Sequence, residues 1–284
     1  MPKFINILTQ VISEQKRYKF APDVYEKLHR VVDELWKNRN NPYKGKTVVD
    51  QLPFKLASGV DGVVKFIVNP KLPFIGLMGT RPKKSLDPAD IFIEVNPKHY
   101  ESKKNLYLTL FHEMIHASDP TQSYMWKPSY ELTYDEKSDE KYWGHPIEFF
   151  AITNEFLEGL VLEFQRRLKK YKNPEQIKVQ KRILDNIVDY FAKGKPLTKQ
   201  SLYLLQRIND ENIGDSKMSQ VIASFQEIHP EISDIVPPMY ETDPYYLHYV
   251  QMIKRYNPKI WPRFLTMLYK TKLEIENMFK EKGD

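Results

Sequence analysis

One helical segment constrains this chain more than any other feature, because it carries two histidines four residues apart among apolar side chains. It runs from 103 to 117 and holds His112, Glu113 and His116 in the pattern His-Glu-X-X-His. The apolar residues are dense enough for a buried helix, which Pro120 ends. Residues four apart leave the same face of a helix, so both imidazoles can reach one metal ion. Glu113 lies beside them, where it can accept a proton from water.

A short strand is expected immediately before this helix. Residues 90–96 alternate apolar and polar side chains and end at Asn96-Pro97, which is typical of a strand with one buried face. A strand that leads into a buried helix carrying His-Glu-X-X-His resembles the zincin metallopeptidases. In that family the strand lies at the edge of a sheet, and an extended substrate adds to it as another strand. The resemblance therefore implies a zincin-like lobe with an edge strand at 90–96.

A catalytic zinc ion needs a third protein ligand, and the candidates lie in the segment 142–156. The chain has no cysteine, which excludes thiolate ligands. Pro146 suits the first position of a helix, and this places Glu148 in the first turn. The residues alone leave Glu148, His145 and Glu155 open as the third ligand.

The run Glu148-Phe149-Phe150-Ala151 resembles the glutamate helix of the gluzincins, particularly the lethal-factor-like group. This resemblance implies that His112, His116 and Glu148 bind Zn²⁺. It also implies that Glu113 is the general base.

The resemblance covers only residues 90–156, and Ile152 stands where that group often has a second glutamate. In the group a tyrosine precedes the ligand glutamate by about two helical turns. Tyr142 is near that offset, so the resemblance implies that it stabilises the oxyanion. Asp119, one turn after His116, is a candidate hydrogen-bond partner for a ligand imidazole.

The pattern of the whole chain predicts an α+β fold with a small mixed sheet beside the motif helix, followed by a mainly helical C-terminal lobe. We predict two domains, a zincin-like lobe at 1–145 and a helical lobe at 146–284 that carries the third ligand and a substrate-recognition region. The predicted strands are 47–50, 63–68, 72–78 and 91–95. The predicted helices are 22–37, 146–170, 174–193, 197–209, 216–228 and about 244 to the end.

The net charge of +6 is concentrated in a basic run that begins at Arg166. We expect a solvated helix end there, because lysines are favoured at helix C-termini; steering of an acidic partner, nucleic acid or anionic lipid is the alternative. No run of apolar residues is long enough to span a membrane. The first residues lack the apolar core of a signal peptide, so we expect a cytoplasmic protein or one secreted without a signal peptide and delivered into a host cell.

Together these features predict a zinc-dependent endopeptidase that hydrolyses a specific protein. The preferred biological role is a bacterial effector or toxin that cuts a host protein, with no nucleic acid as partner. One alternative is a SprT-like protease of DNA-bound proteins, with His145 as ligand and the basic run on phosphates. Another is a non-catalytic binding protein.

Overall fold

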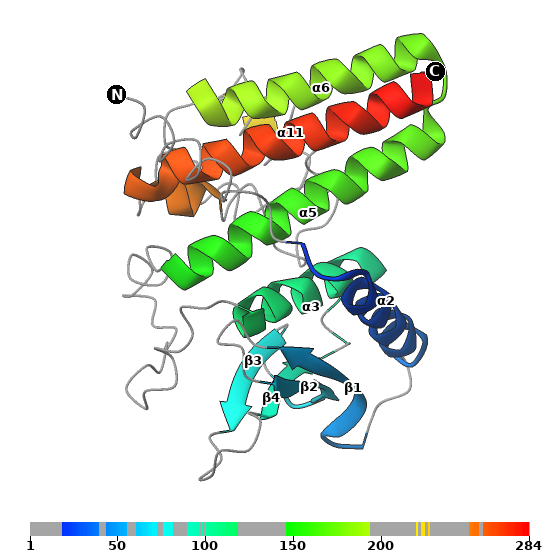
Figure 1. The fold of residues 1–284 in the computed structure, drawn as a ribbon, viewed down its shortest axis with the longest axis vertical. Coiled ribbons are helices and arrows are strands. Elements are labelled where there is room, and N and C mark those ends of the chain that lie inside the picture. Colours follow the sequence, from blue (N-terminus) through cyan, green and yellow to red (C-terminus); the bar gives the residue numbers. More distant parts are fainter. Residues whose placement is uncertain are drawn as a thin grey trace. The chain divides into compact units, whose positions relative to one another are not determined.

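The computed structural model describes the chain in separate stretches, which form two compact units (Figure 1). Among the described residues, those from 19 to 118 and from 146 to 155 form what we call the sheet unit, and those from 156 to 283 form the helical unit. The described residues are 19–39, 44–55, 61–72, 76–81, 90–96, 98, 100, 102–118, 146–193, 220, 223–224, 227, 250–255 and 258–283.

Four strands form one mixed sheet in the sheet unit, and this confirms the small mixed sheet that the sequence predicts. They are β1 (Thr47–Lys55), β2 (Asp61–Val68), β3 (Gly76–Arg81) and β4 (Asp90–Val95), in the order β1-β2-β4-β3. β1 is antiparallel to β2, β4 is parallel to β2, and β3 is antiparallel to β4.

The expectation that the strand at 90–96 lies at a sheet edge is wrong. β4 is hydrogen-bonded to β2 on one side and to β3 on the other, so β3 and β1 are the edges of the described sheet. The alternation of Ile91, Ile93 and Val95 correctly indicated a buried face. Alternation reports which face of a strand is buried, but it carries no information about which strands lie beside it.

β3 begins later than the predicted strand 72–78, because the chain first makes a turn. The backbone N–H of Leu72 donates to the carbonyl of Asn69 at 3.0 Å. The side-chain amide of Asn96 donates to the carbonyl of Leu72 at 3.0 Å and fixes this turn beside the end of β4. Leu72 is buried and serves as an anchor of the turn, not as the first residue of a strand.

Two helices pack with this sheet. α2 (Pro22–Lys37) has the predicted bounds, and its apolar stripe packs against α3 and β1. α3 (Lys103–Ser118) packs against α2, β3 and β4 and is buried nearly all round, which explains its dense apolar sequence.

In the described part of the helical unit there are three long helices, α5 (Pro146–Lys170), α6 (Pro174–Lys193) and α11 (Trp261–Gly283), the last preceded by the short 3₁₀ helix η5 (Pro258–Ile260). The first ten residues of α5 belong to the sheet unit and the rest to the helical unit. Phe156, Phe191 and Phe264 pack together with ring centroids 5.4–5.9 Å apart.

The helices predicted at 146–170 and 174–193 are confirmed, while 197–209 and most of 216–228 lie outside the described residues. The α+β class is confirmed. The division into domains at residues 145 and 146 stays a prediction. Within the described residues, no helix has the combined length and apolar character that crossing a bilayer requires.

Candidate metal centre

The two histidines of α3 point from the same helix face and meet at their Nε2 atoms. These atoms of His112 and His116 are 2.9 Å apart, and the ring centroids are 4.6 Å apart. The side chains are only 14% and 8% exposed. An apolar helix that is buried on most faces therefore brings two imidazoles to one point, as the four-residue spacing predicts.

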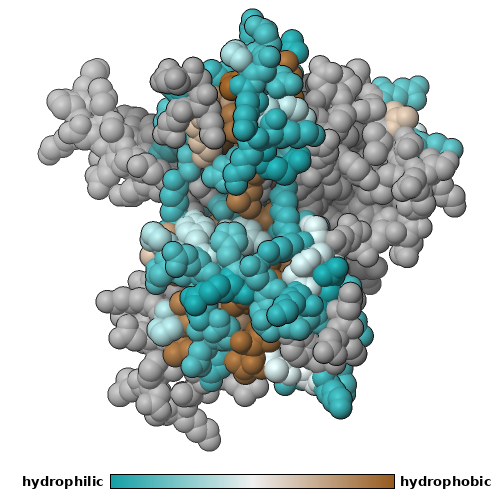
Figure 2. Space-filling view, turned by 90° about the vertical axis from the view of Figure 1, so that its right-hand side faces the viewer, coloured by the Kyte–Doolittle hydropathy of each residue, from teal (hydrophilic) through white to brown (hydrophobic). Residues whose placement is uncertain are grey.

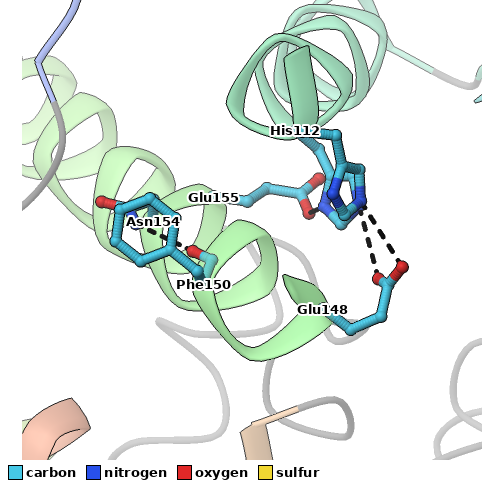
Figure 3. Close-up of polar contacts among 6 residues, drawn as sticks. His112, Glu148, Phe150, Asn154 and Glu155 are labelled. Carbon is cyan, nitrogen blue, oxygen red and sulfur yellow. Dashed lines mark hydrogen bonds and ion pairs between the residues drawn. The ribbon is translucent and has the colours of Figure 1, made fainter. Parts of the chain in front are cut away.

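Glu148 comes from the first turn of α5 and faces the same point (Figure 3). Its carboxylate oxygens lie 3.8 Å from Nε2 of His112 and 3.5 Å from Nε2 of His116. The three side chains can each offer one ligand atom, and these atoms lie within 4.8 Å of one another. We call His112, His116 and Glu148 the candidate metal cluster.

The spacing of the cluster fits a tetrahedral metal ion. Two ligand atoms bonded to one zinc ion at about 2.0–2.1 Å in tetrahedral geometry lie roughly 3.3 Å apart. The three observed separations of 2.9, 3.5 and 3.8 Å lie on both sides of that value. Two imidazole nitrogens and a carboxylate oxygen are also a donor set that suits zinc.

Glu155, two helical turns after Glu148, lies against the other side of the His112 ring (Figure 3). Its Oε2 is 2.7 Å from Nδ1 of His112. A carboxylate at this distance accepts a hydrogen bond from Nδ1–H, so Nε2 is the nitrogen that faces the cluster and that would give its lone pair to a bound metal ion. Glu155, one of the candidate third ligands, is therefore a hydrogen-bond partner of His112.

Three buried carboxylates make this site strongly electronegative. Burial opposes the charged form of His112, but Glu155, Glu113 and Glu148 outweigh it and raise the pKa of His112 to about 10. Such a site favours a cation. A divalent ion bound between the ligand atoms would offset the buried negative charge.

Glu113 is 9% exposed and directly follows His112 in α3. Burial raises the pKa of Glu113 above its usual value, and Glu148 and Glu155 add to the rise, while the two imidazoles oppose it. A carboxylate with a raised pKa is a better proton acceptor than an ordinary one.

The structure brings His112, His116 and Glu148 together in one cluster, and Glu113 interacts electrostatically with all three. Nδ1 of His116 is buried and has no hydrogen-bond partner within the described part of the chain. Tyr142, His145 and Asp119 lie outside the described residues.

Tyr100 is a residue near the site that the sequence reasoning missed. It is 7% exposed, its hydroxyl hydrogen-bonds the side chain of Thr109, and its pKa is raised well above the usual value by burial and by Glu113 and Glu155. Its position three residues before α3 gave no signal, because nothing distinguishes it from the chain's other tyrosines.

Comparisons of the chain with protein-family models, with curated proteins and with solved structures found no match. The geometry of the described residues is therefore the basis for a functional proposal.

Proposed function

We propose that this protein is a zinc-dependent endopeptidase of the gluzincin type. The observation that carries the proposal is the meeting of Glu148 with the two histidines of a His-Glu-X-X-His helix. His112, His116 and Glu148 would hold the ion. Bound there, zinc would supply Lewis acidity to a water molecule and to a substrate carbonyl.

The chain's own residues have distinct roles in this proposal. Glu113 accepts a proton from the attacking water and passes it to the leaving amine, and its raised pKa suits both transfers. Glu155 holds the His112 ring with Nε2 toward the cluster. Tyr142 stays the predicted donor to the oxyanion.

The sheet supports a zincin-like arrangement with β3, not β4, as the substrate strand. β3 is an edge strand and packs against α3, the helix that carries the histidines. An edge strand offers backbone groups to an extended peptide. The other edge, β1, contains Pro53 and a register shift between Val48 and Asp50, and both features discourage the addition of a strand.

The test of peptidase activity is hydrolysis of a quenched-fluorescent peptide library by the zinc-loaded protein and by Glu113→Gln. We expect the wild type to cleave and the variant to be at least about 100-fold slower, because a general base contributes that much or more. Both proteins should bind equal amounts of zinc. Equal cleavage by both proteins would contradict the assigned role of Glu113.

The ligand set is tested by the zinc content of the wild type, Glu148→Ala and His145→Ala, purified identically. We expect near-stoichiometric zinc that falls only in Glu148→Ala. A selective loss in His145→Ala would instead favour a three-histidine protease of the SprT-like kind. A wild type without zinc after reconstitution would favour the non-catalytic binding protein. The role of a bacterial effector acting on a host protein stays a prediction.

A further inference from the structure

The net positive charge of the chain comes from one short segment of the helical unit. Residues 166–182 contain eight lysines and arginines and one acidic residue, Glu175, which gives +7. The whole chain carries +6, so all other residues together carry −1. The excess is therefore a local property of the end of α5, the turn after it and the start of α6.

These residues lie at one end of the helical unit, where three helix ends meet. The ring of Phe279, near the end of α11, lies 5.9 Å from that of Phe164 in α5. The Nζ of Lys181 in α6 lies 5.8 Å from the centroid of the Phe279 ring. Figure 1 shows α5 ending, α6 beginning and α11 ending side by side, and hydrophilic residues cover most of this end in Figure 2.

Six exposed cations at this end have no carboxylate partner among the described residues. Arg166 and Arg167 both form ion pairs with Glu163, at 2.6 and 2.8 Å. The six cations, which we call the basic end, are Lys169, Lys170, Lys172, Lys178, Lys181 and Arg182.

Stabilisation of a helix end does not account for the basic end. Lys169 and Lys170 lie in the last turn of α5, where the helix dipole favours cations. Lys178, Lys181 and Arg182 lie in the first half of α6, where the dipole gives them no such benefit. The prediction of a solvated helix end therefore covers only part of the charge.

We propose that the basic end binds an acidic segment of a protein partner. The segment from Lys172 to Arg182 spans about 15 Å at the rise of an α-helix. A nucleic-acid duplex or a membrane extends far beyond such a patch, and the other residues of the chain, with a net charge of −1, offer it no further excess of positive charge. A short acidic segment matches the patch in size.

An exposed apolar side chain supports a protein partner over other anions. Val179 is 41% exposed between Lys178 and Arg182, and the half-buried ring of Tyr171 lies beside Lys170. Phosphate groups gain nothing from an exposed valine, whereas a peptide offers apolar side chains next to its carboxylates.

The test compares three labelled or immobilised probes: a peptide of alternating glutamate and leucine, a random-sequence DNA duplex of similar length, and vesicles containing phosphatidylserine. All binding is measured at low salt with zinc-free Glu113→Gln protein, so the result does not depend on peptidase activity. The patch variant replaces Lys169, Lys172, Lys178 and Arg182 with glutamine. The control variant makes the same replacement at four exposed lysines of the sheet unit, Lys37, Lys44, Lys71 and Lys98.

We expect the peptide to bind the parent and the control variant, and to bind the patch variant at least about tenfold more weakly. Circular dichroism of each variant verifies that it is folded. Equal losses in both variants, undiminished binding by the folded patch variant or no peptide binding by the parent would each overturn the proposal. Patch-dependent binding of DNA or vesicles that exceeds peptide binding would assign the basic end to that ligand instead.

Discussion

The contact between Glu155 and Nδ1 of His112 determines how one imidazole can act. A histidine has two ring nitrogens. A hydrogen-bond acceptor at one nitrogen holds the proton there, so the other nitrogen is the one that can offer a lone pair to a metal ion. The 2.7 Å distance to a buried carboxylate directs Nε2 of His112 toward His116 and Glu148. A carboxylate partner also makes the ring a stronger donor to a metal ion.

Replacing Glu155 with glutamine keeps the size of the side chain and a hydrogen-bond acceptor but removes the charge. We expect Glu155→Gln to bind zinc about 10–100-fold more weakly than the wild type, the usual effect of losing such a partner. Competition with a chromogenic chelator measures the affinity. Glu175→Gln, at an exposed position in α6, is the matched control and should bind zinc as the wild type does. An unchanged affinity in Glu155→Gln would refute the positioning role.

At the scale of elements, α5 supplies two groups to one site because they lie seven residues apart on it. Glu148 and Glu155 are separated by almost two full turns and therefore share a helix face. One helix thus contributes a member of the candidate metal cluster and the hydrogen-bond partner of another member. A side-chain contact also joins two elements of the sheet unit, α2 and β1.

Lys27 of α2 donates to both carboxylate oxygens of Asp50 in β1, at 2.7 and 2.8 Å. Partial burial raises the pKa of Asp50, but the hydrogen bonds from Lys27 and from the backbone of Gln51 outweigh it and lower the pKa below 3.8. A lowered folded-state pKa adds stability above the unfolded value of 3.8, and this is lost as pH falls through the folded value.

We expect Asp50→Asn to lower the free energy of unfolding at pH 7 by roughly 0.5–1 kcal/mol, since the pair is partly exposed. Below pH 3.8 the difference from the wild type should shrink as Asp50 becomes protonated in both states. Urea unfolding of the wild type and of Asp50→Asn, at pH 7 and below pH 3.8, measures the difference in the free energy of unfolding. A difference that stays constant across this range would assign the effect to packing and not to charge.

Sequence patterns predicted where helices and strands begin and end better than they predicted which elements lie side by side. The bounds of α2, α5 and α6 followed from apolar periodicity and from the prolines at their first positions. The edge position of β4 was wrong, because strand order depends on contacts between segments distant in sequence.

The same limit applies to the site. The histidine spacing and the early position of Glu148 in its helix are local properties, and the sequence shows both. Glu155 was considered only as a ligand, because its contact with His112 spans 43 residues of chain. Tyr100 could not be predicted, because its burial and its electrostatic interaction with Glu113 depend on the folded structure and not on the residues next to it in sequence.

At the scale of the molecule, the two units share α5 along the chain. Its residues 146–155 belong to the sheet unit and carry Glu148, and those from 156 onward belong to the helical unit. The residues of the candidate metal cluster come from two segments, 112–116 and 148, separated by about thirty residues of sequence. A metal ion bound by both segments would stabilise the folded chain relative to the unfolded one.

We expect zinc at 100 times its dissociation constant to stabilise the folded state by about 2.7 kcal/mol and to raise Tm by roughly 5–10 °C. Differential scanning fluorimetry with zinc and with a chelator measures this shift. Glu148→Ala should show little shift at the same zinc concentration. A shift of equal size in Glu148→Ala would mean that zinc stabilises the protein from another place.

The donor atoms of the candidate metal cluster are nitrogen and oxygen, in a chain without cysteine. Zinc sites built from thiolates lose their ligands when peroxide oxidises the sulfur. Imidazole and carboxylate groups have no place on that oxidation ladder. A metal ion held by the candidate metal cluster would therefore have no thiolate ligand to lose when its surroundings change from reducing to oxidising.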